Sequence, residues 1–358
     1  MPLRIAWFIS NHGWGHLNRS MVALRSLIDA GHRVLVVTAS DMSEAARQAV
    51  PDADQASGAL DRGYAFGAGG RGADPDRSRP LLRFATKVDE TVRRGVRGWG
   101  PDVVVADATP WASAVAADLD VPSVICSNFS WDDQYAALYT LYKGDRQAAG
   151  AVDTIRQHVR RFDLALELPL GPGIPSVRTR QPIPLVGRKP TDGVTLSSPP
   201  TVTWAFGRTP LDEQPADCLD ALIEVCRQYG LDVAANTTVA DAYPGVIRAV
   251  ADAAYWPDVL ASSRLVVTKT GYSTVAEALR GPSHVIAFGI TGLPEERAML
   301  AEIEARDYGR GIPLDESDPA GRLAAVASEL LRQPPRVPVT EDGTSALERA
   351  LVDLAAGR

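Results

Sequence analysis

Two of the chain's five histidines, His12 and His16, lie four residues apart, directly after a short apolar run. Gly13 and Gly15 stand beside them and let the backbone approach a ligand closely. Because imidazole exchanges protons near neutral pH, a histidine here is suited to general-base catalysis. We therefore expect His16 or His12 to be a catalytic base. Gly13, Trp14 and Gly15 are expected to lie beside the acceptor, which is the molecule that this base deprotonates. The alternative is that one histidine caps the following helix and the other packs under Trp14.

A second candidate site begins where a buried strand ends at Lys269. Gly271 allows a tight turn, after which Ser273 or Thr274 is expected to cap a helix that carries Glu277 in its first turn. Open amides at a helix start favour an anion, and Lys269 adds positive charge. The segment therefore predicts a phosphate or pyrophosphate site, with Glu277 accepting hydrogen bonds from a ribose diol. The alternative is an ordinary turn with Ser273 and Glu277 as a capping pair.

Carboxylates follow two further apolar runs. Asp107 ends one run, and Asp132 and Asp133 follow the other. Because the carboxyl ends of parallel strands meet at one sheet edge, these groups are expected near the histidines, where Asp107 or Asp132 would orient the base. The residues expected to hold the acceptor there are Asn128, Trp131 and Asp133. The alternative is that Asp107 and Ser130 cap helices, while Trp131 and Tyr135 belong to the core.

Two other motifs are interpreted as loops. Residues 67–72 match the string G-x-G-x-x-G, but no clear strand precedes them and no long helix follows, so we expect a mobile loop. Asp52 and Asp54 have a spacing that some sugar transferases use for a divalent metal. They follow Pro51 with no strand in front, which favours a solvated pair, and no metal site is predicted.

The elements that would position these residues alternate between strand and helix. Strands are expected at 4–10, 34–37, 102–106, 123–126, 201–206, 231–235, 264–269 and 284–288. Helices are expected at 19–30, 111–119, 216–229 and 273–280. Continuous apolar strands are typical of parallel sheets that are buried on both faces. The chain is therefore expected to be an α/β protein with two doubly wound halves.

Proline spacing divides the chain. Eight of the 26 prolines fall between residues 169 and 200, which predicts an interdomain connection there. The expected parts are an N-terminal acceptor-binding domain at 1–168, the connection at 169–200 and a C-terminal donor-binding domain at 201–344. A helix at 345–358 is expected to pack back on the N-terminal domain. Hinging about the connection is expected during product release.

Composition excludes several classes of protein. The 358 residues carry a net charge of -7 with no basic run, so nucleic acid is not an expected partner. Three cysteines without C-x-x-C spacing favour reduced, buried thiols over disulfides or zinc. No apolar run approaches the roughly 20 residues of a membrane span, and the apolar start is too short for a signal peptide. We expect a cytoplasmic protein; its oligomeric state stays open.

Residues 256–260 and 270–279 together resemble the donor-binding region of two-domain (GT-B) glycosyltransferases, including the MurG-like and macrolide-type enzymes. The chain is more closely similar to the glycosyltransferase-like N-terminal region of L-arabinokinases and its bacterial stand-alone relatives. The matching stretches are residues 12–16, 61–63, 127–132, 269–272, 294–296 and 308–311. This resemblance implies two facing Rossmann-like domains with a cleft between them. The family usually has a small residue where Asn11 stands.

The resemblance also implies roles for single residues. It places the donor pyrophosphate at Gly271, Tyr272, Ser273 and Thr274, the ribose at Glu277, and the transferred sugar at Glu295 or Glu296. Thr270 and Gly207, which follows the strand at 201–206, are expected in the same donor site. His16 would be the base. No ATP-phosphate loop is present, so sugar-kinase activity is not implied.

Together these patterns predict a metal-independent, inverting glycosyltransferase that needs no cofactor. The expected donor is a nucleotide-sugar, most simply UDP-linked, and the acceptor a small polar molecule such as a sugar, an aminocyclitol or a nucleobase. Two alternatives stay open: a nucleotide-sugar sensor or scaffold that lacks turnover, and a nucleotide-sugar epimerase.

Overall fold

The computed structural model describes residues 2–66, 72–140, 145–198, 200–207 and 209–357. These residues form two compact units. The first contains residues 2–66, 73–186 and 341–357, and the second contains residue 72 and the described part of 187–340. The division at 186/187 falls inside the proline-rich stretch.

The first unit is built on a parallel sheet of seven strands in the order β3-β2-β1-β6-β7-β8-β9. The strands are β1 (Arg4–Ile9), β2 (Arg33–Ala39), β3 (Asp54–Gly58), β6 (Val103–Asp107), β7 (Ser123–Ser127), β8 (Leu164–Glu167) and β9 (Arg180–Pro182). A short antiparallel pair joins β4 (Ala65–Phe66) to β5 (Ala73–Asp74). The order changes direction at β1, as expected of a doubly wound sheet.

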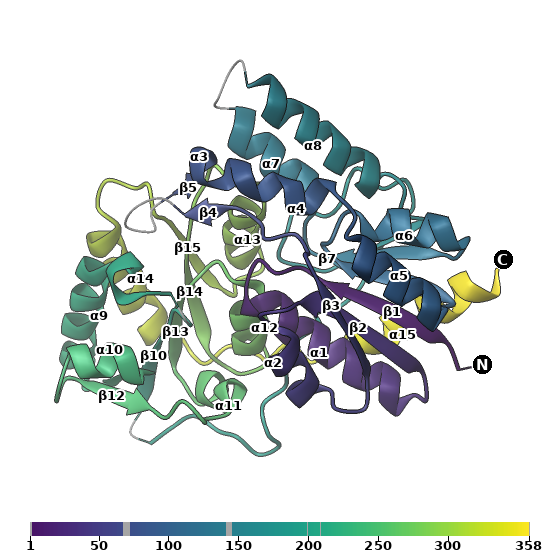
Figure 1. The fold of residues 1–358 in the computed structure, drawn as a ribbon. Coiled ribbons are helices and arrows are strands. Elements are labelled where there is room, and N and C mark those ends of the chain that lie inside the picture. The colour runs from purple at the N-terminus through teal and green to yellow at the C-terminus, as the bar shows by residue number, and fades with distance from the viewer. Residues whose placement is uncertain (1, 67–71, 141–144, 199, 208, 358) are drawn as a thin grey trace. The chain divides into compact units, whose positions relative to one another are not determined.

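Helices cover both faces of this sheet (Figure 1). On one face lie α1 (Trp14–Asp29), α2 (Ser43–Ala49) and the C-terminal α15 (Thr344–Ala356), which contacts α1. The other face carries α5 (Glu90–Trp99), α6 (Ala112–Leu119) and α8 (Arg146–Val159). The remaining short helices are α3 (Pro75–Ser78), a 3-10 turn (Arg79–Leu81), α4 (Leu82–Thr86) and α7 (Trp131–Thr140).

The second unit repeats this plan with six parallel strands in the order β12-β11-β10-β13-β14-β15. The strands are β10 (Thr201–Ala205), β11 (Asp232–Asn236), β12 (Ile247–Val250), β13 (Leu265–Lys269), β14 (His284–Gly289) and β15 (Gly309–Pro313). In Figure 1, α9 (Ala216–Tyr229) and α14 (Pro319–Arg332) cover one face, and α12 (Tyr272–Leu279) and α13 (Pro294–Ala305) cover the other. The remaining helices are a 3-10 turn (Leu211–Glu213), α10 (Thr237–Ala242) and α11 (Trp256–Ala261).

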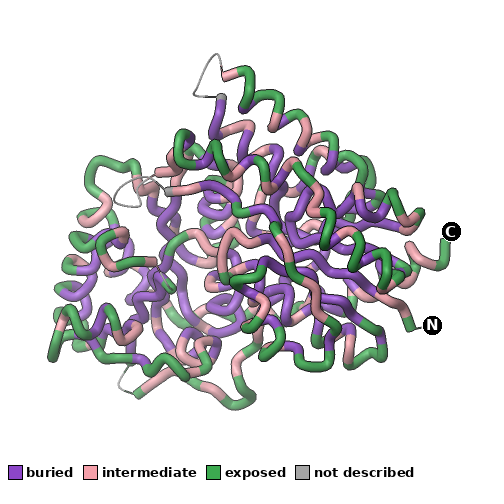
Figure 2. The backbone as a smooth tube through the Cα atoms, in the orientation of Figure 1, coloured by how far each residue is buried: buried purple, intermediate pink, exposed green. Residues whose placement is uncertain are grey.

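The central strands of both sheets are buried along their length (Figure 2). Every residue of β6 and β7 is buried, which explains why these strands have continuous apolar sequences rather than alternating ones. The predicted α/β class and parallel sheets are therefore confirmed. Among the described residues, no helix combines the length and the apolar character needed to cross a membrane.

Two helix starts differ from the prediction. Helix α1 begins at Trp14 rather than Arg19, so Gly15 and His16 lie in its first turn and not in a loop. Its N-cap is Gly13 at φ +146°, a conformation that L side chains rarely adopt, and the half-exposed Trp14 hides the apolar periodicity. Helix α12 begins at Tyr272 after the N-cap Gly271, so neither Ser273 nor Thr274 caps it.

The predictions for the cysteines and for the two loop motifs have different outcomes. All three cysteines are free and buried, as predicted. Asp54 does not lie in a loop, because it begins the edge strand β3, where its carboxylate accepts from Arg33 at 3.1 Å and from the Trp99 indole at 2.7 Å. Asp52 lies in the preceding turn. The glycine-rich segment lies outside the described residues except for Gly72.

Gly309, at the start of β15, tests how closely β15 packs against β14 in the second sheet. Its φ is +153°, and a Cβ there would lie 1.7 Å from the Val285 carbonyl oxygen. We expect Gly309→Ala to destabilise the chain by about 3 kcal/mol, because backbone strain and overpacking add. The midpoint of denaturant unfolding measures the change. Gly292→Ala is the control, since its Cβ would meet nothing within 4 Å; an equal midpoint for the two variants would contradict this packing.

Candidate functional site

The side chains of His16 and Asp107 form a buried pair at the carboxyl edge of the first sheet. His16 lies in the first turn of α1, and Asp107 is the last residue of β6. His16 Nδ1 lies 2.9 Å from Asp107 Oδ1. The exposed fractions are 7% for His16 and 1% for Asp107. The pair therefore has the geometry of a histidine oriented by a carboxylate.

Asp107 also holds two further residues of α1. Arg19 binds it through two nitrogens, Nε to Oδ2 at 2.8 Å and Nη2 to Oδ1 in a short contact. Ser20 Oγ donates to Oδ2 at 2.9 Å. Residues 16, 19 and 20 share one helix face because they are three and four positions apart. Neither Arg19 nor Ser20 was predicted as a site residue, because the helix was expected to begin only at Arg19.

The charge of Asp107 is stabilised by its neighbours. Burial by itself would raise the pKa of this carboxyl, but the charges of Arg19 and His16 and their hydrogen bonds hold it well below its ordinary value. Asp107 therefore stays ionised across the physiological range, so that it accepts hydrogen bonds and does not donate them. It does not cap a helix, which excludes the capping alternative.

His12 lies in an aromatic cluster beside His16. Its ring centroid is 4.7 Å from Tyr64 and 4.9 Å from Trp131, and 6.2 Å from His16. Gly63, at φ +65°, makes this packing possible, since a Cβ there would lie 2.1 Å from His12 Nδ1. His12 Nδ1 lies 3.4 Å from the Arg62 carbonyl oxygen. His16 is the histidine that Asp107 orients.

Asp61 is a second buried carboxyl in this region. Its Oδ2 accepts from Ser10 Oγ at 2.5 Å and from the Trp131 indole at 2.6 Å, so it ties the end of β1 to α7. Oδ1 makes no hydrogen bond among the described residues. Burial raises the pKa of Asp61 above its ordinary value. Only its place in residues 61–63, one of the matching stretches, pointed to it in the sequence.

The other residues predicted for the site in the first unit differ in burial and in hydrogen-bond partners. Asn128 is fully buried and binds Arg19 through Oδ1 at 2.7 Å. Trp131 is fully buried, as is Asp132, whose Oδ2 accepts from Ser176 at 2.5 Å and lies 3.8 Å from Arg156. Asp132 therefore does not orient His16. The residues that keep some exposure are Gly13, Trp14, Gly15 and Asp133.

In the second unit, the predicted donor residues gather at the carboxyl ends of β10, β13 and β14. Gly271 is the N-cap of α12 and has no side-chain cap, and the first helical bond runs from the Val275 amide to the Gly271 carbonyl at 3.1 Å. Thr274 is half-buried, while Tyr272 and Ser273 are buried. Gly207, at φ +62°, follows the neighbouring strand β10. Lys269 is exposed at the end of β13, but partial desolvation by its neighbours lowers the pKa of its ammonium, while the charges of Glu296 and Glu213 oppose this change.

Glu277 is held by a residue that the sequence did not indicate. Arg188 binds it through Nε to Oε1 at 2.7 Å and Nη2 to Oε2 at 3.0 Å, and Glu277 is 3% exposed. Glu277 lies in the second turn of α12, not the first. Burial raises the pKa of Glu277, and Arg188 acts against that rise. Arg188 lies in the proline-rich stretch, where no periodicity or motif marks a site residue.

Glu296 organises the loop after β14. Its Oε2 accepts from Thr270 Oγ1 at 2.9 Å and from the Ile290 amide at 2.7 Å, so it joins the ends of β13 and β14. Glu296 is buried, whereas Glu295 is half-buried. Of these two carboxylates, Glu296 therefore holds the Thr270 turn.

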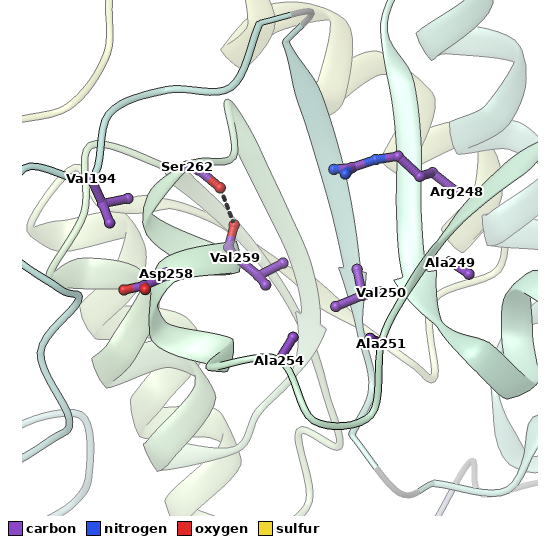
Figure 3. A pocket seen from close by; sticks show the side chains of 9 residues that line it. All are labelled: Val194, Arg248, Ala249, Val250, Ala251, Ala254, Asp258, Val259 and Ser262. Carbon is purple, nitrogen blue, oxygen red and sulfur yellow. Dashed lines mark hydrogen bonds between the residues drawn. The ribbon is translucent and has the colours of Figure 1, made fainter.

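A pocket of about 390 Å³ lies at the edge strand β12 and α11, and Figure 3 shows its lining. Its walls are mostly apolar, with Arg248, Asp258 and Ser262 as polar groups. Asp258 is already bound by Thr191, from its amide at 2.6 Å and its hydroxyl at 2.8 Å. None of the predicted site residues lines this pocket. Within the described ranges, no three His, Cys, Asp or Glu side chains are grouped to hold a metal ion.

Comparison with known proteins places this geometry in a known fold. No family model matches the chain. The chain is 29% identical to the L-arabinokinase of Arabidopsis thaliana, over 77% of this chain but only 27% of that protein. This match agrees with the resemblance seen in the motifs.

Solved glycosyltransferase structures match nearly the whole chain. The kitacinnamycin glycotransferase has a TM-score of 0.68 at 19% identity, covering 99% of this chain and 96% of that one. VinC in complex with dTDP has a TM-score of 0.64 at 16% identity. LpCGTa in complex with UDP has a TM-score of 0.68 at 15% identity. Each of these two matches covers 99% of this chain and 100% of the other chain. The predicted GT-B fold is thereby confirmed.

The buried Asp107 carboxylate should contribute to stability in a pH-dependent way. Its pKa is lower in the folded than in the unfolded chain, so its contribution is present above the ordinary aspartate value of about 4 and is lost as the pH falls below it. We expect Asp107→Asn to lower the free energy of unfolding by about 3 kcal/mol at pH 7. The difference in this free energy between the variant and the unchanged chain should become smaller toward pH 3. Denaturant unfolding at both pH values measures this. Asp118→Asn, at a surface pair with Arg93, should cost less than about 1 kcal/mol; an Asp107→Asn deficit of the same size at both pH values would argue against an ionised Asp107.

Removing Arg188 should make the stability depend on the protonation of Glu277. Without its partner, the buried carboxyl has a still higher pKa in the folded chain, so stability falls as the pH rises through that value. Arg188→Met should lose about 3 kcal/mol at pH 8 and recover much of it near pH 5. The control is the double variant Arg188→Met with Glu277→Gln, which should show no such recovery. If it recovers equally, the pH effect does not come from Glu277.

Proposed function

We propose that this chain is a metal-independent, inverting glycosyltransferase that moves a sugar from a UDP-linked donor to a small polar acceptor. The observation that carries the proposal is the buried pair of His16 and Asp107 at the edge of the first sheet. The uncapped start of α12 after Gly271, in the second unit, supports a donor with a diphosphate. The similar structures in complex with UDP and dTDP support a nucleoside diphosphate.

In this proposal His16 removes the proton of the acceptor. Asp107 holds Nδ1, which leaves Nε2 to take the proton as the acceptor attacks the anomeric carbon. A single displacement through an oxocarbenium-like transition state inverts the configuration of that carbon. Positioned bases of this kind contribute about 100-fold to 10,000-fold in rate.

The second unit would stabilise the leaving diphosphate. The first amides of α12 and the side chains of Lys269, Ser273 and Thr274 are the groups proposed to bind it. Glu277 would bind the ribose while Arg188 holds its carboxylate, and Glu295 would bind the transferred sugar. Glu296 supports the same loop through Thr270. Positive charge from Lys269 would take the part that a metal ion plays elsewhere.

The proposed acceptor class rests on the polar groups of the predicted acceptor site that keep some exposure. Asp133 is half-buried, and burial together with the charge of Asp132 raises its pKa. Carboxyl groups favour an acceptor with hydroxyl or amine donors, which suits a sugar, an aminocyclitol or a nucleobase. Trp14, 36% exposed at the start of α1, offers an aromatic face for the same acceptor.

Product masses distinguish this function from its two alternatives. Transfer adds the mass of the sugar to the acceptor and needs both substrates. An epimerase converts the nucleotide-sugar without an acceptor and leaves its mass unchanged. A sensor or scaffold binds nucleotide but gives no product with any acceptor.

Nucleotide binding gives the test of the donor site. We expect one of UDP, dTDP, GDP, ADP and CMP to raise the unfolding temperature, and the rise to be the same with and without magnesium. At about 100 times the dissociation constant the added stability is about 2.7 kcal/mol. Lys269→Ala should reduce the rise, whereas Lys87→Ala, an exposed lysine of the first unit, should not. No rise with any nucleotide would remove the basis for the transferase proposal.

A further inference from the structure

Arg19 Nη2 lies among more acceptors than it has hydrogens. This nitrogen contacts Asp107 Oδ1 in a short hydrogen bond, and lies 2.9 Å from Ser127 Oγ and 2.9 Å from His16 Nδ1. A guanidinium Nη carries two hydrogens. One is used by the Asp107 carboxylate, since a charge-assisted bond is the strongest of the three. Ser127 and His16 therefore compete for the other.

The outcome of this competition fixes the tautomer of His16. If Ser127 accepts the second Nη2 hydrogen, His16 Nδ1 can carry its own hydrogen and donate it to Asp107 Oδ1, 2.9 Å away. If His16 Nδ1 accepts that hydrogen instead, its nitrogen lone pair faces the negatively charged Oδ1 at the same distance, which is repulsive. The first arrangement gives both Asp107 Oδ1 and Ser127 Oγ a donor, and the only one of these contacts without a hydrogen bond is that between Arg19 Nη2 and His16 Nδ1, which both donate to Oδ1.

We infer that Arg19 and Ser127 are positioning residues that hold His16 in the tautomer with hydrogen on Nδ1. Ser127 is the last residue of β7, is fully buried, and removes from His16 the one hydrogen that would favour the other tautomer. Arg19 keeps Asp107 ionised and oriented to accept from Nδ1. Neither residue touches the reacting atoms.

The tautomer decides what His16 can do. With hydrogen on Nδ1, Nε2 has a lone pair and can accept a proton. With hydrogen on Nε2, the ring can only donate there, and general-base catalysis is lost. The catalytic meaning of this inference rests on the proposed transferase function, but the tautomer itself does not depend on any reaction.

Nitrogen NMR on the full-length protein labelled with ¹⁵N-histidine tests the inference. The chain has five histidines, and His16→Gln identifies the signals of His16. At pH 8 the unchanged chain should show His16 with a protonated Nδ1 and an unprotonated Nε2. Ser127→Ala should shift the tautomer equilibrium of His16 toward a protonated Nε2, because the second hydrogen of Arg19 Nη2 is then available to His16 Nδ1. Ser127→Ala removes one buried hydroxyl and is expected to fold, whereas Arg19 variants leave the buried Asp107 carboxylate without its guanidinium partner.

Ser113→Ala is the matched control, since it removes a buried hydroxyl of the same unit that donates to the carbonyls of Pro110 and His158. It should leave the His16 signals unchanged. With donor and acceptor, Ser127→Ala should lower kcat about tenfold or more with little change in KM. An unprotonated Nδ1 in the unchanged chain, or a Ser127→Ala spectrum identical to it, overturns the inference. Failure to find transfer with any substrate would count against the proposed function alone, because the NMR result needs no substrate.

Discussion

The ion pair of Asp107 and Arg19 is the constraint on which the first unit depends. A carboxylate and a guanidinium, 1% and 4% exposed, are stable in the interior only because both oxygens and all three nitrogens have partners. Those partners lie on α1, on β6, at the end of β7 and at Asn128, which follows β7, so the pair fixes α1 over the sheet edge. His16, three residues before Arg19, is carried into place by the same helix. Loss of either charge would leave the other buried and unpaired, so the position of His16 and the stability of the unit are linked.

In the second unit, hydrogen bonds hold the start of α12 in place. Gly271 is the N-cap and makes no side-chain cap hydrogen bond to the first amides of α12. The turn before it is fixed from the side, by Glu296 through Thr270, and the helix is fixed by the bond between Glu277 and Arg188. Buried carboxylates thus support both candidate sites. In the first unit Asp107 binds a histidine, and in the second Glu296 and Glu277 hold the loop and the helix of the proposed donor site.

Much of the fold follows from the sequence, because buried parallel strands have continuous apolar runs and end at polar residues. The strand that ends at Asp107 and the turn at Gly271 were located in this way. The start of α1 was not, because Gly13 at positive φ and an exposed Trp14 give no helical periodicity. That error hid the helix face that His16, Arg19 and Ser20 share toward Asp107. Arg188 could not be found either, since a pairing across 89 residues from a proline-rich segment has no local signal. The sequence also could not choose between Asp107 and Asp132, a choice that depends on which strand ends lie side by side.

The most direct test of this account is the rate of transfer by His16→Gln, measured under saturating donor and acceptor and compared with the unchanged chain. The account predicts a fall of at least about 100-fold in kcat, while the nucleotide still raises the unfolding temperature by the same amount. His12→Gln, which alters the neighbouring histidine packed between Tyr64 and Trp131, should lose much less. An unchanged rate for His16→Gln, or an equal loss for both variants, would contradict the assignment of His16 as the base held by Asp107.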